Sequence, residues 1–231
     1  MLLPSQRKSS YVCFANVHMI VEAQKDPEFR KVVNNADMVT PDGRPLSVFL
    51  NLLKGSRTER AAGMDILPEL LRRSEKRHKS VFFYGSTDDV LRAIADRIAR
   101  ELPGLRVAGM ISPPFRALSG EEKKAYIRQI NAAEPDFVLV SLGCPKQENW
   151  MAEHRGKINA CMMGLGQAFR TYAGIEKRLP KWMRDLSLEW IYRLSLEPGR
   201  LWKRYLVTNT LFLWYTGRLF LNSMLRRGTD L

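Results

Sequence analysis

Residues 136–150, DFVLVSLGCPKQENW, and residues 160–174, ACMMGLGQAFRTYAG, decide the fold of this chain. Each begins as an uninterrupted apolar run, breaks at a glycine-containing turn and continues as a helix-forming sequence. A strand followed by a helix, repeated in this way, is typical of βαβ units and a parallel sheet. Both helices begin where parallel strands end, so their free backbone N–H groups predict an anion-binding edge of the sheet.

Further strands and helices of the same kind are expected before this stretch. Apolar runs and helical periodicity alternate along the chain, which predicts an α/β protein with a Rossmann-like parallel sheet flanked by helices. The expected strands are residues 11–15, 38–40, 80–85, 105–111, 136–141 and 159–163, and the expected helices include residues 64–77, 88–102 and 119–133.

The last quarter of the chain has a different composition. After Gly174 the strand pattern stops, and Trp, Arg and Leu recur at helical spacing. Residues 177–231 hold 11 Lys and Arg against 4 Asp and Glu, so +7 of the net charge of +13 lies there. We therefore expect residues 1–175 to form the α/β domain and residues 176–231 to form a basic, helical appendage.

The charge of +13 and the pI near 9.9 imply an anionic partner. Nucleic acid, an acidic membrane surface and a phosphorylated substrate all satisfy this requirement. The interleaving of aromatic and basic residues in the appendage also suits nucleic acid, but the chain carries no recognised nucleic-acid-binding motif. Helices rich in Trp and Leu with cationic faces favour an anionic membrane surface instead.

Three features bear on cellular location. The opening residues MLLPSQRKSSYV lack the apolar centre of a signal peptide. Cys13, Cys144 and Cys161 have no paired spacing, which favours a reducing cytosol. Residues 205–217 form the longest uncharged apolar stretch near the C-terminus, and their 13 residues fall short of the about 20 needed to cross a bilayer. We expect a soluble or peripheral cytoplasmic protein.

No metal and no cofactor are predicted. The three histidines are scattered, and no Cys/His pair with ligand spacing and no Asp-x-Asp motif occurs. Gly164-Leu165-Gly166 resembles the start of a dinucleotide fingerprint, but Phe169 stands where the third glycine would be. The two glycines still allow a ligand to approach the backbone closely.

Several polar residues lie at turns where an α/β protein binds ligands. Asp42, in the turn Pro41-Asp42-Gly43, is a candidate general base, although Asp-Gly is also an ordinary turn dipeptide. Gln147 and Glu148 are able to hydrogen-bond a sugar or a uracil edge, although an acidic first helical turn also explains them. Arg60 is able to bind phosphate or to lie on a solvated surface.

The motifs in this order resemble the WecG/TagA/CpsF glycosyltransferases. The resemblance covers about residues 11–213 and rests on PDG, RxxGxD, PKQE, GLGxxF and LEWIYRLxxEPxRLxKRY, which begin at Pro41, Arg60, Pro145, Gly164 and Leu188. It implies an inverting, metal-independent transfer of a sugar from a nucleotide diphosphate, usually UDP. The implied acceptor is a polyprenyl-diphosphate-linked saccharide at the inner face of the cell membrane, in exopolysaccharide or cell-wall polymer biosynthesis.

The resemblance also assigns roles to residues of this sequence. Asp42 becomes the catalytic base, and Asn16, in the segment FANVH, lines the same pocket. Arginines and helix N-termini replace a metal in neutralising the leaving diphosphate. The implied donor- and substrate-binding residues are Asn16, Arg60, Gly63, Gln147, Glu148, Gly164, Gly166, Arg193, Arg200 and Arg204.

Three departures from the family pattern accompany this resemblance. Phe14 stands where members often carry Thr, Arg170 stands where an Asp often follows the Phe of the glycine-rich turn, and about twenty residues of a usual first strand and helix are missing before Tyr11. Phe14 and Arg170 support an alternative function, a non-catalytic binder of nucleotide-sugar or anionic membrane on the same fold. The sequence leaves homo-oligomerisation open.

Overall fold

A six-stranded sheet forms the centre of the fold. The computed structural model describes residues 9–54, 58–185, 188–196 and 198–228. The strands lie in the order β2-β1-β6-β5-β3-β4. Their bounds are β1 Ser10–Ala15, β2 Met38–Pro41, β3 Ser80–Gly85, β4 Arg106–Ile111, β5 Phe137–Ser141 and β6 Cys161–Gly164.

Every strand runs in the same direction. The pairs β1–β6, β6–β5, β5–β3 and β3–β4 are parallel. Beside β1, the N–H of Asp37 donates to Tyr11 O and the N–H of Asp42 donates to Ala15 O. Both sequences increase in the same direction, so β2 is parallel to β1. The predicted fold class is confirmed, and each expected strand is present with its ends shifted by at most two residues.

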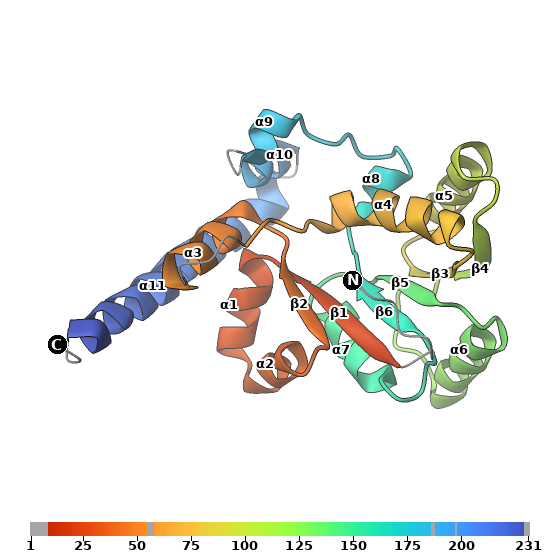
Figure 1. Ribbon diagram of the computed structural model, residues 1–231, viewed down its shortest axis with the longest axis horizontal. Coiled ribbons are helices and arrows are strands. Elements are labelled where there is room, and N and C mark those ends of the chain that lie inside the picture. Colours follow the sequence, from red (N-terminus) through yellow and green to blue (C-terminus); the bar gives the residue numbers. More distant parts are fainter. Residues whose placement is uncertain (1–8, 55–57, 186–187, 197, 229–231) are drawn as a thin grey trace. The chain divides into compact units, whose positions relative to one another are not determined.

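The chain divides into two compact units, and the first carries most of the sheet. It comprises residues 1–14, 31–39 and 62–177. Figure 1 shows α4, α5 and α8 on one face of its strands and α6 and α7 on the other. These helices are α4 Gly63–Lys76, α5 Asp88–Glu101, α6 Gly120–Ala132, α7 Lys146–His154 and α8 Ala168–Tyr172.

Helices on both faces explain why the strands are apolar throughout rather than alternating. All six residues of β3 are buried, and so are the first four residues of β5. On the α4–α5–α8 face, Phe83 packs edge-on against Phe169 with ring centroids 5.4 Å apart. Leu67 and Leu71 of α4 join the same core cluster with no measurable exposure.

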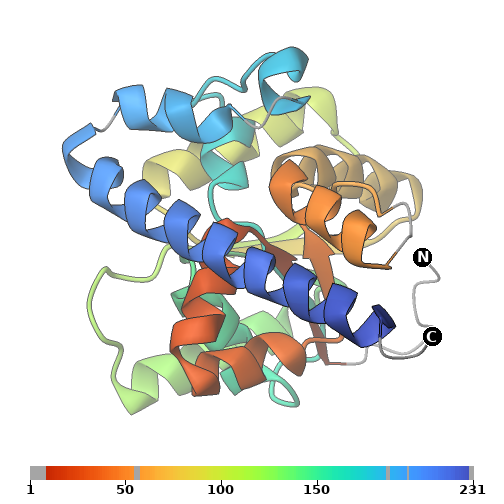
Figure 2. The same cartoon turned by 90° about the vertical axis from the view of Figure 1, so that its left-hand side faces the viewer.

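The second unit comprises residues 15–30, 40–61 and 178–231. Its long helix α11 contacts α1, α10 and α3, and Figure 2 shows α11 lying across α1 with α3 alongside. No helix within the described ranges is long and apolar enough to cross a membrane. The remaining helices of the chain are α1 Val17–Lys25, α2 Pro27–Asn34, α3 Arg44–Lys54, α9 Lys181–Asp185, α10 Glu189–Leu196 and α11 Pro198–Gly228.

Sequence periodicity identified the helices of the first unit but did not identify α1, α2 and α3. Each of these has 11 residues or fewer. Asn16 caps α1 by accepting a hydrogen bond from Met19 N, and this N-cap residue is the sequence feature that marks the start of α1. The boundary at residue 175 between a catalytic domain and an appendage stays a prediction.

Gly85, at the end of β3, provides a test of the sheet packing. Its φ is +108°, and a Cβ at this position would lie 2.3 Å from Ser141 O. We expect Gly85→Ala to lower the free energy of unfolding by about 3 kcal/mol, because the new methyl group meets backbone in a conformation that disfavours L-residues. Urea denaturation measures the change.

Gly120 is the matched control. A Cβ there meets nothing within 4 Å, and the residue begins α6 after the Ser119 cap. Gly120→Ala is expected to leave stability within about 1 kcal/mol of the parent. A Gly85→Ala variant as stable as Gly120→Ala would contradict the described packing of β3 on β5.

Candidate active site

A buried pair of polar side chains lies at the start of α7 in the first unit. Gln147 is 6% exposed and Glu148 is 0% exposed. Gln147 Nε2 donates to Glu148 Oε1 at 2.8 Å and to Gly164 O at 3.1 Å. The pair therefore joins the first turn of α7 to the carboxyl end of β6.

The environment of this pair opposes negative charge. Burial raises the pKa of Glu148 above its ordinary value, although hydrogen bonds from Gln147 and Cys144 act in the opposite direction. Burial, with a smaller contribution from Glu148, also raises the pKa of the Cys13 thiol to about 12. Cys13 is therefore a neutral thiol at physiological pH, with no character of a nucleophile.

Two acceptor atoms of the pair have no hydrogen bond from the part of the chain that the structure describes. They are Gln147 Oε1 and Glu148 Oε2. Buried polar atoms are nearly always hydrogen-bonded, and an unpaired buried acceptor is costly. These two atoms are thus suited to accept hydrogen bonds from N–H or O–H groups of a ligand.

Glycines make room for the pair. A Cβ on Gly164 would lie 2.9 Å from Met151 Cε and 3.0 Å from Gln147 Nε2. Gly166 has a φ of +47°, and a Cβ there would lie 3.4 Å from Gln147 Oε1. Gly63 opens α4 against the same turn, since its Cβ would lie 3.4 Å from Leu165 Cδ2. The predicted residues Gly63, Gln147, Glu148, Gly164 and Gly166 are therefore brought together.

A charged cluster that the sequence analysis missed lies beside this turn. Arg170 Nε donates to Glu176 Oε1 at 2.6 Å, and Gln167 Nε2 donates to Glu176 Oε2. Glu176 thus supplies a carboxylate beside the position where Arg170 departs from the family pattern. The six-residue spacing of Arg170 and Glu176 does not match a helical i, i+4 pair, so periodicity gave no sign of it.

In the second unit, Asp42 and Asn16 follow neighbouring strand ends. Asp42 comes directly after β2, is partly exposed, and its N–H donates to Ala15 O at 2.7 Å. Asn16 is the residue after Ala15, and its Oδ1 accepts from Met19 N at 3.0 Å. Because this cap uses the side-chain oxygen of Asn16, the side chain would contact a substrate through its amide nitrogen. The carboxylate and the amide therefore lie at adjacent turns.

The structure describes the side chain of Arg60 but not those of the other three predicted arginines. Arg60 lies one residue before Ala61, whose N–H donates to Pro41 O at 2.9 Å beside the Asp42 turn. Its Nη1 donates to Arg184 O of α9 at 3.5 Å. The side chains of Arg193, Arg200 and Arg204 lie outside the described residues, and their roles stay predictions.

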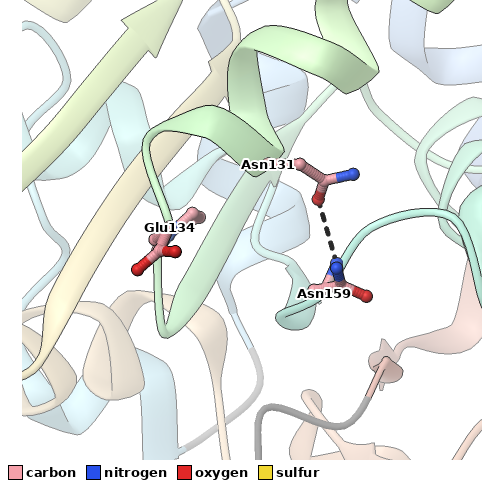
Figure 3. A pocket seen from close by; sticks show the side chains of 4 residues that line it. Asn131, Glu134 and Asn159 are labelled. Atoms are coloured by element: carbon pink, nitrogen blue, oxygen red, sulfur yellow. Dashed lines mark hydrogen bonds between the residues drawn. The ribbon is translucent and has the colours of Figure 1, made fainter.

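A polar hollow of about 380 Å³ occupies the opposite edge of the sheet. Asn131, Glu134, Pro135 and Asn159 line it, before the amino ends of β5 and β6. Figure 3 shows the Asn159 N–H directed at Asn131 Oδ1, a bond of 3.1 Å, with Glu134 turned away from both. No predicted site residue lines it, and α/β sheets bind ligands at the carboxyl edge.

Among the described residues, no three His, Cys, Asp or Glu side chains gather as ligands for a metal ion. The expectation of metal-independent chemistry stays a prediction. The anion-binding groups that the sequence predicts are backbone N–H groups at helix starts and arginine side chains, and this assignment also stays a prediction.

Comparison with known proteins gives consistent matches. The family model described as "Glycosyl transferase WecG/TagA/CpsF family" matches residues 2–227. A Bacillus subtilis (strain 168) protein named N-acetylglucosaminyldiphosphoundecaprenol N-acetyl-beta-D-mannosaminyltransferase is 33% identical over 202 residues, covering 87% of this chain and 77% of that protein. A Staphylococcus aureus (strain NCTC 8325 / PS 47) protein of the same name is 27% identical over 195 residues, covering 84% and 73%. The resemblance drawn from the motifs is confirmed.

The burial of Glu148 predicts a pH dependence of stability. Its pKa is raised in the folded chain above the ordinary value of 4.5, so the folded chain binds the proton more tightly than the unfolded chain. The associated stability is present below that ordinary value and is lost as pH rises through the folded pKa. We therefore expect Glu148→Gln to gain stability relative to the parent between pH 4 and pH 8, as measured by urea denaturation.

Glu153→Gln removes a carboxylate from an exposed position of the same helix and controls for the loss of one negative charge. Only the Glu148 variant is expected to diverge from the parent with rising pH. Two variants whose stability follows the parent equally at every pH would show that Glu148 is not buried as described.

Proposed function

The chain belongs to the WecG/TagA/CpsF family and is a glycosyltransferase, and from this premise we propose that it transfers a sugar from a UDP-sugar to a polyprenyl-diphosphate-linked saccharide. The relatives' names specify an N-acetylmannosaminyl group and an N-acetylglucosaminyl-diphosphoundecaprenol acceptor. UDP-N-acetylmannosamine and that lipid are therefore the first substrates to test. The proposed context is cell-wall polymer or exopolysaccharide biosynthesis.

The observation that carries the proposal is the buried pair Gln147 and Glu148 beside the Gly164–Gly166 turn. Two acceptor oxygens without a hydrogen bond from the described residues suit the N–H of an acetamido group or of uracil, or the hydroxyls of a sugar. The glycines admit the ligand close to backbone. The positive end of the α7 dipole would favour the donor diphosphate.

We assign the role of general base to Asp42. Its carboxylate would take the proton of the acceptor hydroxyl while that oxygen attacks the anomeric carbon. The bond between the anomeric carbon and the β-phosphate oxygen breaks, and UDP leaves with the electron pair. A single displacement of this kind inverts the configuration at the anomeric carbon.

The leaving diphosphate requires positive charge in the transition state. We propose that arginines supply it in place of a metal ion, with Arg60 from the second unit and Arg193, Arg200 and Arg204 from the appendage. Asn16, next to the Asp42 turn, would orient the acceptor through its amide nitrogen. The proposed location is the inner face of the cell membrane, where the basic appendage meets anionic lipid.

The Arg170–Glu176 pair favours a second candidate, a binder of nucleotide-sugar that does not catalyse transfer. This pair occupies the position at which the chain departs from the family pattern. Tight binding of a UDP-sugar without turnover on any polyprenyl-diphosphate acceptor would support this candidate over the transferase.

Asp42→Asn tests the assignment of the base. Removing a general base slows chemistry by about 10²- to 10⁴-fold, so UDP release with acceptor present is expected to fall by that factor. Because the amide is similar in size, donor binding measured by calorimetry is expected to stay within about threefold of the parent.

Asp26→Asn is the matched control in the same unit. Asp26 Oδ1 accepts from Glu28 N and Phe29 N, and an asparagine preserves this cap. Full activity of Asp26→Asn beside an inactive Asp42→Asn supports the base. An Asp42→Asn variant that turns over at the parental rate would refute it.

Chelation tests the arginine-based mechanism. We expect transfer to proceed at an unchanged rate in excess EDTA, because helix N-termini and guanidinium groups neutralise the diphosphate. Initial rates of UDP release with EDTA and with added Mg²⁺ provide the measurement. A strict requirement for Mg²⁺ would overturn this part of the proposal and leave the assignment of Asp42 intact.

A further inference from the structure

Helix α3 carries an apolar stripe that faces away from the second unit. Val48 and Leu52, one helical turn apart, are 47% and 64% exposed. Leu46 and Ser47 on the opposite side are buried, so the helix packs through one face and presents the other. Exposed aliphatic side chains at i and i+4 form a surface rather than isolated contacts.

The neighbouring helix α11 also carries exposed apolar side chains. Phe49 of α3 packs edge-on against Phe212 of α11 with ring centroids 6.2 Å apart, and Figure 2 shows the two helices side by side. Thr208 and Phe212 face inward on α11. Trp202, Leu206 and Leu213 recur at helical spacing on its other side and are all exposed.

The charge of α3 and α11 indicates which kind of partner covers their exposed apolar side chains. The sequences of α3 and α11 contain no Asp or Glu but eight Lys and Arg, namely Arg44, Lys54, Arg200, Lys203, Arg204, Arg218, Arg226 and Arg227. Exposed apolar side chains on two helices whose own sequences are basic match an anionic bilayer surface, where aliphatic and Trp side chains enter the acyl boundary and cations meet phosphates. A second copy would set like charges against each other.

We propose that α3 is a membrane-docking element that enters an anionic bilayer through Val48 and Leu52, together with the exposed apolar side chains of α11. This inference rests on the proposed function in one respect, that the acceptor is held in the bilayer. It adds to the appendage a contact from the first third of the chain, next to Asp42.

Docking of α3 would determine how far Asp42, the proposed catalytic base, lies from the bilayer. Arg44 opens α3 two residues after Asp42, and Ser47 N donates to Gly43 O at 3.2 Å, so the turn is continuous with the helix. Val48 lies only about 6 Å along the helix from its first residue, at a rise of about 1.5 Å per residue. Docking of α3 would therefore hold Asp42 close to the headgroup layer, where the diphosphate of a lipid-linked acceptor lies.

Vesicle binding tests the proposal on the full chain. With vesicles of equal parts phosphatidylglycerol and phosphatidylcholine, we expect Val48→Gln/Leu52→Gln to partition at least about tenfold more weakly than the parent in sedimentation. Phe115→Gln removes a side chain that is 89% exposed in the first unit, and is expected to bind within about twofold of the parent. Equal binding of all three proteins would overturn the proposal.

A fluorescent label reports which surface meets lipid. An environment-sensitive dye on Leu52→Cys is expected to shift to shorter wavelength when vesicles are added, whereas the same dye on Phe115→Cys is expected to stay unchanged. A shift at position 52 that grows with protein concentration in the absence of vesicles would show a second copy on this face and refute the bilayer. Matching thermal unfolding of the variants confirms that they are folded.

Activity separates this proposal from the transferase. With the acceptor in detergent micelles, Val48→Gln/Leu52→Gln is expected to transfer sugar at the parental rate, and with the acceptor in vesicles it is expected to lose activity with its binding. A parent inactive in both settings, with the label at position 52 still shifting, would refute the transferase and retain the docking surface. A double variant that is fully active on vesicles would refute the docking role.

Discussion

Burial of a carboxyl group at the end of a parallel sheet is the constraint on which the candidate site depends. Glu148 has no exposed surface, and removing a carboxylate from water is costly unless it is paired or protonated. Gln147 reduces part of this cost by donating a hydrogen bond to Glu148. The same amide nitrogen also donates to the carbonyl of Gly164. A side chain larger than hydrogen at Gly164 would displace this amide. The glycine, the amide and the carboxyl group therefore form one arrangement.

Much of this arrangement was predictable from local sequence. Buried parallel strands are uniformly apolar because helices cover both faces, so β3 and β5 could be recognised as uninterrupted runs. The turn residues Gln147, Glu148, Gly164 and Gly166 could be placed at one edge, since parallel strands end together. The hydrogen bond from Gln147 to Gly164 could not be predicted, because it joins residues 17 positions apart and depends on a side-chain conformation that only packing decides.

The elements that the sequence analysis missed share a physical cause. Helices α1 to α3 are short, and each begins with a different sequence feature. These features are a capping Asn16, a proline at position 27, and an Arg-Pro pair at positions 44 and 45. Short helices are stable through tertiary contacts rather than through their own periodicity. For α3, that contact includes Phe49 against Phe212, far along the chain in α11, which no local pattern reveals. Glu176 escaped notice for a related reason, since its partner Arg170 belongs to a helix that ends before Glu176.

The two units differ in how their charged residues are distributed. In the first unit, acidic and basic groups are mixed, as in the Arg170–Glu176 and Arg155–Asp37 pairs, and the buried Glu148 accepts a hydrogen bond from the neutral amide of Gln147. In the second unit, α3 and α11 contain no acidic residue, and acidic residues lie on the neighbouring helices α1 and α10, which carry Glu22 and Glu189. A positive field at a protein surface attracts anions only over about a Debye length, roughly 8 Å at physiological salt. If α3 docks on a membrane as proposed, so short a range would act on lipid phosphates only at contact, and the Asp42 turn at the start of α3 would lie close to that contact.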